Sequence, residues 1–137
     1  MAELAAVLRP ALLRATRMIR NQRADMSVTL TLVSAMATLY KRGPMSAGEL
    51  AGHECVQPPS MTKVLSHLEE RGLVRREPHP TDRRQAIIAI TDAGVDLLES
   101  ERRSRDAWLT QQLARLTPDE RALLRKVVPV LDKLAEQ

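Results

Sequence analysis

The sequence predicts a mainly α-helical fold, of the α+β type, that carries one small β-hairpin. Over most of the 137 residues, apolar side chains recur at the spacing of amphipathic helices. The period changes once, at residues 73–77 and 85–90, where two short runs rich in branched side chains are typical of strands. With 44% hydrophobic and 28% charged residues, the chain has the composition of a single globular domain.

Two helices are expected in the N-terminal third of the chain. The first should cover residues 3–23, where apolar residues form one stripe and arginines recur at every third position on another. Pro10 lies inside this stretch, so the helix should either begin there or bend there. The second helix is expected from about Thr29 to Lys41, because a glycine and a proline follow it at positions 43 and 44.

Two shorter helices follow, separated by a tight turn. Ser46 opens the first, with a glutamate three residues later as its capping-box partner, and this helix should end near Gly52. The second begins at Gln57, which two prolines follow. Proline suits a first helical turn because the N–H that it lacks would have no helical partner there. This second helix should end at Gly72.

The two predicted strands are joined by a loop over residues 78–84, in which two prolines stiffen a tip that carries two arginines. Thr91 is then placed to cap a long helix that reaches roughly Leu116. A second capping box at Thr117 opens the last helix, which Pro129 should bend.

The terminal helices carry more apolar surface than the small central part of the chain can bury. The last helix alone has seven leucines and valines between residues 123 and 134. Burying these faces against each other and against a second copy of the chain is the simplest solution. The sequence therefore predicts a two-fold homodimer joined through its terminal helices.

Two short helices followed by a hairpin with a basic tip form the layout of a winged helix-turn-helix. In this layout the second short helix lies in the major groove of double-stranded DNA, with its N-terminal residues nearest the bases. The positive end of the helix dipole there favours a phosphate. Polar side chains on this helix can hydrogen-bond base edges or phosphates. The DNA-binding residues predicted on the two helices are Ser46, Gln57, Pro59, Ser60, Thr62, Lys63, Ser66 and His67.

The hairpin supplies a second predicted contact with DNA. Arg83 and Arg84 at its tip can enter a minor groove, where the negative potential is concentrated. Asp82 is expected to hold one of these arginines in an extended rotamer through a carboxylate–guanidinium pair. Arg75, on the first strand, completes the predicted DNA-binding set.

The composition favours a duplex over a single strand as the partner. A net charge of +4 suits a polyanion, although charge alone does not separate a DNA-binding protein from a merely basic one. Proteins that bind single strands or RNA by stacking need exposed aromatic side chains. This chain has no Phe, one Trp and one Tyr. We expect Trp108 and Tyr40 to be packing residues.

No pattern in the sequence indicates an enzyme. There is no glycine-rich phosphate loop and no nucleophile elbow. The candidate metal ligands have a spacing that fits no closed zinc site. The candidate metal ligands are His53, Glu54, Cys55, His67 and His79. We therefore expect no catalytic residue, no cofactor and no metal site.

A single cysteine excludes an internal disulfide and agrees with a reducing compartment. No apolar run approaches the ~18–20 residues that span a bilayer, and no secretory signal is evident, so we expect a cytoplasmic protein without membrane contact. Cys55 itself is expected to be a small buried turn residue. The alternative is a redox-sensing regulator, because the dipole of the helix that follows Cys55 favours a thiolate.

The stretch from Gly43 to Gly94 resembles the multiple-antibiotic-resistance regulator (MarR) family. The segments that carry the resemblance are GPMSAGELA and QPPSMTKVLSHLEERGLVRREPHPTDRRQAIIAITDAG. The most specific part is Asp82-Arg83-Arg84, followed by a strand and by Ile-Thr-Asp-Ala-Gly at positions 90–94. With the helical flanks in the family's order, the resemblance covers essentially the whole chain.

The resemblance implies one MarR-type domain over residues 1–137. Its winged unit would span about residues 28–92, and its dimerisation helices about residues 1–25 and 107–137. Family members are mostly repressors that bind a pseudo-palindromic site and place the second arginine of an Asp-x-Arg motif, here Arg84, in the minor groove. Many release DNA when a small, often phenolic, effector enters a crevice. The competing interpretation is a helical interaction module whose basic face binds an acidic protein.

Overall fold

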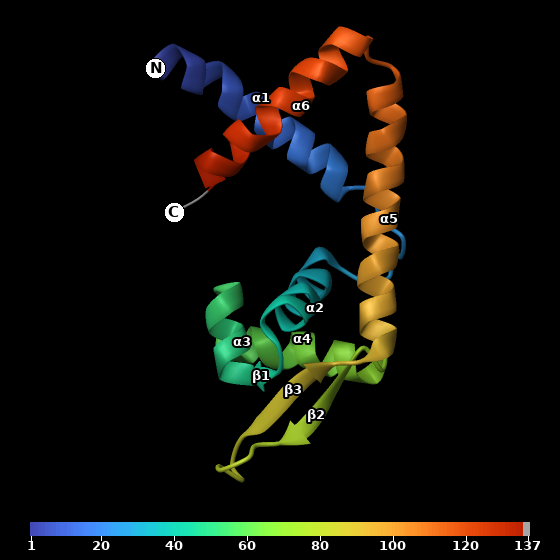
Figure 1. Cartoon of the computed structure of the whole chain (residues 1–137). Coiled ribbons are helices and arrows are strands. Elements are labelled where there is room, and N and C mark those ends of the chain that lie inside the picture. The colour runs from blue at the N-terminus through green and yellow to red at the C-terminus, as the bar shows by residue number, and fades with distance from the viewer. Residues whose placement is uncertain (136–137) are drawn as a thin grey trace. The chain divides into compact units, whose positions relative to one another are not determined.

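The computed structural model describes residues 1–135 (Figure 1). Six α-helices and three strands follow one another in these residues, which confirms the expected mainly helical fold with a small sheet. In chain order they are α1 (Ala2–Arg20), α2 (Leu30–Arg42), β1 (Met45–Ser46), α3 (Ala47–Glu54), α4 (Pro58–Glu70), β2 (Val74–Pro78), β3 (Ala86–Ile90), α5 (Asp92–Ala114) and α6 (Pro118–Ala135).

The described chain divides into two compact units. The first unit contains residues 1–22 and the residues from 103 onward, and the second contains Arg23–Arg102. Helix α5 contributes to both, because it extends across the boundary at residues 102 and 103. None of the described helices is long and apolar enough to cross a membrane.

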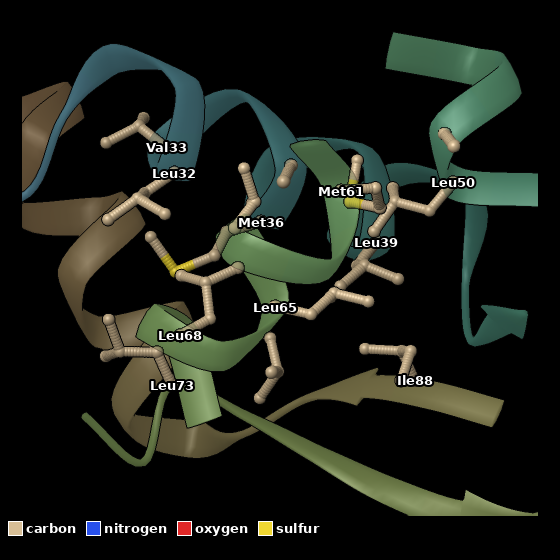
Figure 2. Packing of buried hydrophobic residues seen from close by; sticks show 14 of the residues in the cluster. Leu32, Val33, Met36, Leu39, Leu50, Met61, Leu65, Leu68, Leu73 and Ile88 are labelled. Carbon is tan, nitrogen blue, oxygen red and sulfur yellow. The ribbon is translucent and has the colours of Figure 1, made fainter. Parts of the chain in front are cut away.

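The second unit is built around one hydrophobic core. Side chains from α2, α3, α4 and β3 converge there (Figure 2), and Leu39, Leu50, Leu65 and Ile88 are among those that are fully buried. Each such side chain contributes about 1.5–3 kcal/mol when it leaves water. The two short helices and the hairpin therefore share one packed core.

The sheet has three antiparallel strands in the order β1-β3-β2. Strands β2 and β3 form the expected hairpin, in register from Val74 opposite Ile90 to Pro78 opposite Ala86. Strand β1 was not expected, and it places Met45 opposite Ile88. The strand ties the start of α3 directly to the hairpin.

Four helices begin at side-chain caps, and each of these caps lies where the sequence predicts a helix start. The Ser46 hydroxyl accepts the Glu49 N–H at 3.2 Å, and the Thr91 hydroxyl accepts the Gly94 N–H at 3.2 Å. The capping box at Thr117 is complete, because its hydroxyl accepts the Glu120 N–H at 3.2 Å while its own N–H donates to that glutamate's carboxylate at 2.8 Å. The side chain of Thr29 likewise caps α2. Local capping chemistry therefore sets these helix boundaries.

The two internal prolines do not start or end a helix. Helix α1 includes Pro10 and begins well before it, and α6 includes Pro129. The first helix also ends earlier than expected, at Arg20, with Asn21 as its C-cap. Neither α1 nor α6 has a buried residue among those described. The first unit therefore leaves most of its apolar side chains in contact with solvent.

A buried ion pair anchors the loop between α1 and α2 to α5 within the second unit. Glu101 is fully buried, and its carboxylate accepts the Arg23 Nε–H at 2.9 Å and the Asp25 N–H at 3.2 Å. The Arg23 guanidinium also donates to the Val28 carbonyl. Because a buried charge is costly unless it is paired and hydrogen-bonded, these contacts keep the loop in one place.

The same loop is tied to the end of α4. The Arg71 guanidinium, at the C-cap of α4, donates to the Asp25 carboxylate at 3.0 Å and to the Ser27 hydroxyl at 2.6 Å. Ser27 also donates its backbone N–H to Asp25 at 2.8 Å. Asp25 is therefore the shared acceptor between the loop and α4.

Candidate nucleic-acid interface

Helix α4 presents one apolar and one polar face. Met61, Val64, Leu65 and Leu68 are buried in the core. The side chains that alternate with them are exposed, as the sequence predicts for a helix that faces a groove. Every predicted DNA-binding residue of this helix and its cap is in the exposed set, which consists of Gln57, Pro59, Ser60, Thr62, Lys63, Ser66 and His67.

Two hydroxyls of the exposed face already use their protons within the helix. Thr62 donates to the Pro58 carbonyl at 3.1 Å, and Ser66 donates to the Thr62 carbonyl at 3.0 Å. Their oxygen lone pairs remain available as acceptors. In this conformation the two hydroxyls can accept a hydrogen bond from a base amino group, whereas Lys63 is an exposed cation.

The start of α4 has few amide donors to offer. Gln57 is the N-cap without a side-chain cap, and the next two residues are prolines, which lack an N–H. The Ser60 and Met61 N–H groups both donate to the Gln57 carbonyl, at 3.0 and 3.1 Å. A phosphate at this terminus would therefore meet the helix dipole but no free amide in the first turn, so side chains must supply the hydrogen bonds.

The hairpin extends beyond the helices of its unit and ends in a tight turn (Figure 1). In this turn the Gln85 N–H donates to the Asp82 carbonyl at 3.2 Å, which places Arg83 and Arg84 at the two central positions. Both arginines are exposed, and the Arg84 side chain is 92% accessible. The two charges therefore stand at the outermost point of the hairpin.

The carboxylate of Asp82 organises Arg84, as the sequence predicts. One oxygen accepts the Arg84 backbone N–H at 3.0 Å and the Arg84 Nε–H at 3.4 Å. The other oxygen accepts the Gln85 side-chain amide at 3.4 Å. A side chain that hydrogen-bonds the backbone two residues ahead is typical of aspartate at the first position of a turn.

Sequence reasoning missed a contribution of His79 to the same tip. Its ring Nδ1 accepts the Asp82 N–H at 2.9 Å and the Thr81 N–H at 3.2 Å. The sequence pattern indicates His79 only as a candidate metal ligand. The signal that could have indicated the acceptor role is its position before Pro80, because proline favours the second position of a turn and the residue at the first position is often one whose side chain accepts a backbone amide.

Ser46 and Arg84 border the same hollow, although they come from different elements. The hollow has a volume of about 590 Å³ and lies between the start of α3 and the hairpin. Arg76 also lines it and pairs with Glu69 of α4, with 2.7 Å between Arg76 Nε and Glu69 Oε1. The structure therefore brings the first short helix and the hairpin tip to one surface.

The guanidinium of Arg75, another predicted contact, has two partners within the hairpin. It donates to the Glu77 carboxylate at 2.8 Å and to the Ile90 carbonyl at 3.2 Å. The side chain is exposed. In the structure, Arg75 joins β2 to the end of β3.

Two expectations about burial are wrong. Cys55 is exposed at the C-cap of α3, where its left-handed backbone, with φ of 53°, turns the chain toward α4. Tyr40 was expected to pack, yet it is 61% exposed on α2. Trp108, on the part of α5 that belongs to the first unit, is partly buried.

Comparisons with known proteins agree with this architecture. The model of the MarR family matches residues 28–86. An HTH-type transcriptional regulator of Mycobacterium leprae is 38% identical over 136 residues, which are 99% of this chain and 95% of that protein. The HTH-type transcriptional repressor NicR of Pseudomonas putida is 31% identical over 69% of this chain and 60% of its own length.

Solved structures show the same fold. A transcriptional regulator protein of Pseudomonas aeruginosa has a TM-score of 0.85 and 28% identity, and the match covers 99% of this chain and 96% of that one. The family and these relatives are transcriptional regulators and not enzymes. From its winged helix-turn-helix and from this similarity along nearly its whole length, we conclude that the chain belongs to the MarR family of DNA-binding transcriptional regulators.

Proposed function

We propose that this protein represses transcription in the bacterial cytoplasm by binding a pseudo-palindromic operator as a homodimer. The observation that carries the proposal is the pairing of two features on one rigid unit. The exposed polar face of α4 and the arginine-tipped hairpin are both held by the core around Leu65 and Ile88. A helix and a hairpin in this order suit the major groove and the adjacent minor groove.

The two groove contacts have different tasks. Side chains at the start and along the face of α4, among them Gln57, Ser60 and Lys63, would read base edges in the major groove. Arg84, extended by Asp82, would enter the minor groove, where its charge meets the concentrated potential of the phosphates. Ser46, at the hollow shared with Arg84, would bind a phosphate between the two.

Support for the homodimer comes from the first unit, where no described residue of α1 or α6 is fully buried and many of their apolar side chains are exposed. Val7 is 63% exposed on α1, and Leu134 is 67% exposed on α6. A second copy would bury these side chains and present two winged units to an inverted repeat. The named repressor activity of the Pseudomonas putida relative favours repression over activation. The resemblance to the family further implies release of the DNA by a small-molecule effector.

Selection of bound duplexes from a random pool tests this proposal directly. We expect the selected sequences to contain an inverted repeat. In gel-shift titrations with the selected duplex, affinity should fall by roughly 10³-fold or more between about 50 and 200 mM salt if several phosphates are contacted. Arg84→Ala should weaken binding by about 1–3 kcal/mol, whereas Lys126→Ala, an exposed cation on α6, should not.

Two results would contradict the proposal in different ways. Absence of duplex binding even at ~50 mM salt would favour the interaction module that binds an acidic protein. Normal binding by Arg84→Ala would overturn the assignment of the hairpin tip. Lys63→Ala separates base reading from phosphate binding, because loss at all sequences alike would mark Lys63 as a phosphate contact.

A further inference from the structure

We propose that His79 is a positioning residue for DNA binding, because its ring holds the turn through which Asp82 orients Arg84. The inference rests on the proposed contact between Arg84 and DNA. It adds a residue that does not itself need to touch the duplex.

The first step is the turn that His79 closes. Pro78 and Pro80 flank it, so the backbone on either side has a restricted φ, and the residue before proline is held in an extended conformation. At the first position of such a turn, aspartate, asparagine or serine usually accepts an amide from two residues ahead. Here the Nδ1 atom of His79 takes that place, at 3.2 Å from the Thr81 nitrogen and 2.9 Å from the Asp82 nitrogen.

The second step is the turn that follows without interruption. Asp82 is the last residue held by the His79 ring and the first residue of the turn that contains Arg84. Its carboxylate binds both the backbone N–H and the Nε–H of Arg84. The position of the Asp82 backbone therefore sets where the carboxylate lies, and the carboxylate sets the direction of the arginine.

The ring can act in this way because Nδ1 carries no proton. Two backbone amides point at it, so the neutral ring must have its proton on Nε2. Among the charged groups of the hairpin, Asp82, Arg83 and Arg84 share the tip. Arg75, Arg76 and Glu77 lie on β2, whereas β3 has no titratable side chain. No other ring or carboxylate in the described tip binds the Asp82 N–H.

Three substitutions distinguish the role of His79 as a hydrogen-bond acceptor from a purely steric role of its ring. The amide oxygen of His79→Asn lies close to the position of Nδ1, whereas that of His79→Gln lies one methylene farther out. We expect His79→Asn to bind the selected duplex within about twofold of the unchanged protein. His79→Gln and His79→Ala should lose about two- to tenfold, the net value of about one hydrogen bond. Equal losses for the Asn and Gln variants would overturn the proposal.

A double variant tests whether His79 acts through Arg84. If it does, His79→Ala should cause no further loss of affinity when Arg84 is already alanine. Independent, multiplicative losses would instead show that His79 contacts DNA by itself or acts through another residue. Thermal unfolding of each variant, expected to stay within a few degrees of the unchanged protein, shows that the losses are local.

A measurement on the free protein keeps this inference separate from the proposed function. NMR relaxation of the backbone amides at residues 82–85 should report an ordered turn in the unchanged protein and in His79→Asn, and a more mobile turn in His79→Ala. An equally ordered turn in His79→Ala would overturn the positioning role whether or not the protein binds DNA. Ordered behaviour that depends on His79, together with no binding to any duplex, would contradict only the proposed function.

Discussion

At Cys55 the backbone has a conformation that suits few side chains. Its φ of 53° is left-handed, and its N–H caps α3 by donating to the Gly52 carbonyl at 3.2 Å. Left-handed backbone costs most residues about 1–2 kcal/mol, and asparagine tolerates it better. We expect Cys55→Asn to raise the free energy of unfolding by about 0.5–1 kcal/mol and Cys55→Val to lower it, measured by urea unfolding under reducing conditions. Lower stability of Cys55→Asn would contradict this account of the cap.

Asp25 should make stability depend on pH. Hydrogen bonds from the Ser27 side chain and backbone, with a smaller contribution from Arg71, hold the pKa of this carboxyl below its ordinary value of 3.8. A carboxyl with a lowered folded-state pKa stabilises the fold above its unfolded-state pKa, and this contribution is lost as the pH falls through the folded-state value.

Urea unfolding of Asp25→Asn tests this dependence. The variant should be slightly less stable than the unchanged protein at neutral pH, since the site is at the surface, and the difference should vanish in strong acid. Ser27→Ala removes the largest cause of the pKa shift and should reduce the pH dependence. A difference between Asp25→Asn and the unchanged protein that is constant from neutral to acid pH would contradict the assignment.

Individual residues show where sequence reasoning succeeds. The helix caps of Ser46 and Thr117 and the contact of Asp82 with Arg84 could be predicted, because each side chain binds groups within three residues of it. The exposure of Cys55 could not, because it depends on how the turn after α3 packs in three dimensions. His79 lies between these cases, since its contacts are local but histidine is an uncommon residue at that turn position.

Among the elements, the start of α5 approaches the residues at the base of the hairpin closely at one point, Gly94. A Cβ built on Gly94 would lie 2.4 Å from the Leu73 carbonyl oxygen and 2.6 Å from Ile90 Cγ1. We expect Gly94→Ala to lower the free energy of unfolding by about 1–3 kcal/mol, because backbone must move to relieve the overlap. The close packing around Gly94 thus explains why the Ile-Thr-Asp-Ala-Gly segment ends in a residue without a side chain.

Gly52 provides the matched control on α3. A Cβ there would meet nothing within 4 Å, and its φ is not left-handed. Gly52→Ala should therefore stabilise the protein by about 0.5–1 kcal/mol through helix propensity alone. Equal effects of the two substitutions in thermal or urea unfolding would show that the close approach at Gly94 is relieved without cost.

The helices and strands could be predicted where the sequence shows a periodic spacing of apolar residues or a helix-capping residue. The helices and both hairpin strands were expected within a few residues of their observed bounds, because apolar periodicity and local caps define them. Strand β1 was missed, since its two residues, Met45 and Ser46, are too few to show alternation and pair with β3 some forty residues later. Such pairing is decided by tertiary packing.

For the whole molecule, assembly should depend on the first unit. Aspartate in place of Val7 and Leu134, both highly exposed in the single chain, should prevent two copies from associating, because two charges would be buried without partners. We expect this double variant to sediment as a monomer and to lose affinity for the inverted repeat, since each half-site would then bind alone.

Met26 offers the control for this experiment. It is 81% exposed but lies in the second unit, outside α1 and α6. Met26→Asp should leave the sedimentation of the protein unchanged. A double variant at Val7 and Leu134 that still sediments as a dimer would place the interface on another surface.

The excess of apolar residues in the terminal helices could be predicted from the sequence, but which of them meet in a dimer could not, since that depends on the geometry of two copies.

The position of Trp108 also has a practical consequence. It is the single tryptophan of the chain and belongs to the first unit, whereas the single tyrosine, Tyr40, belongs to the second. Selective excitation of the indole therefore reports on the first unit alone, without a dye and without any substitution. Its intrinsic emission can follow the melting of that unit while the winged unit and added duplex remain spectroscopically silent.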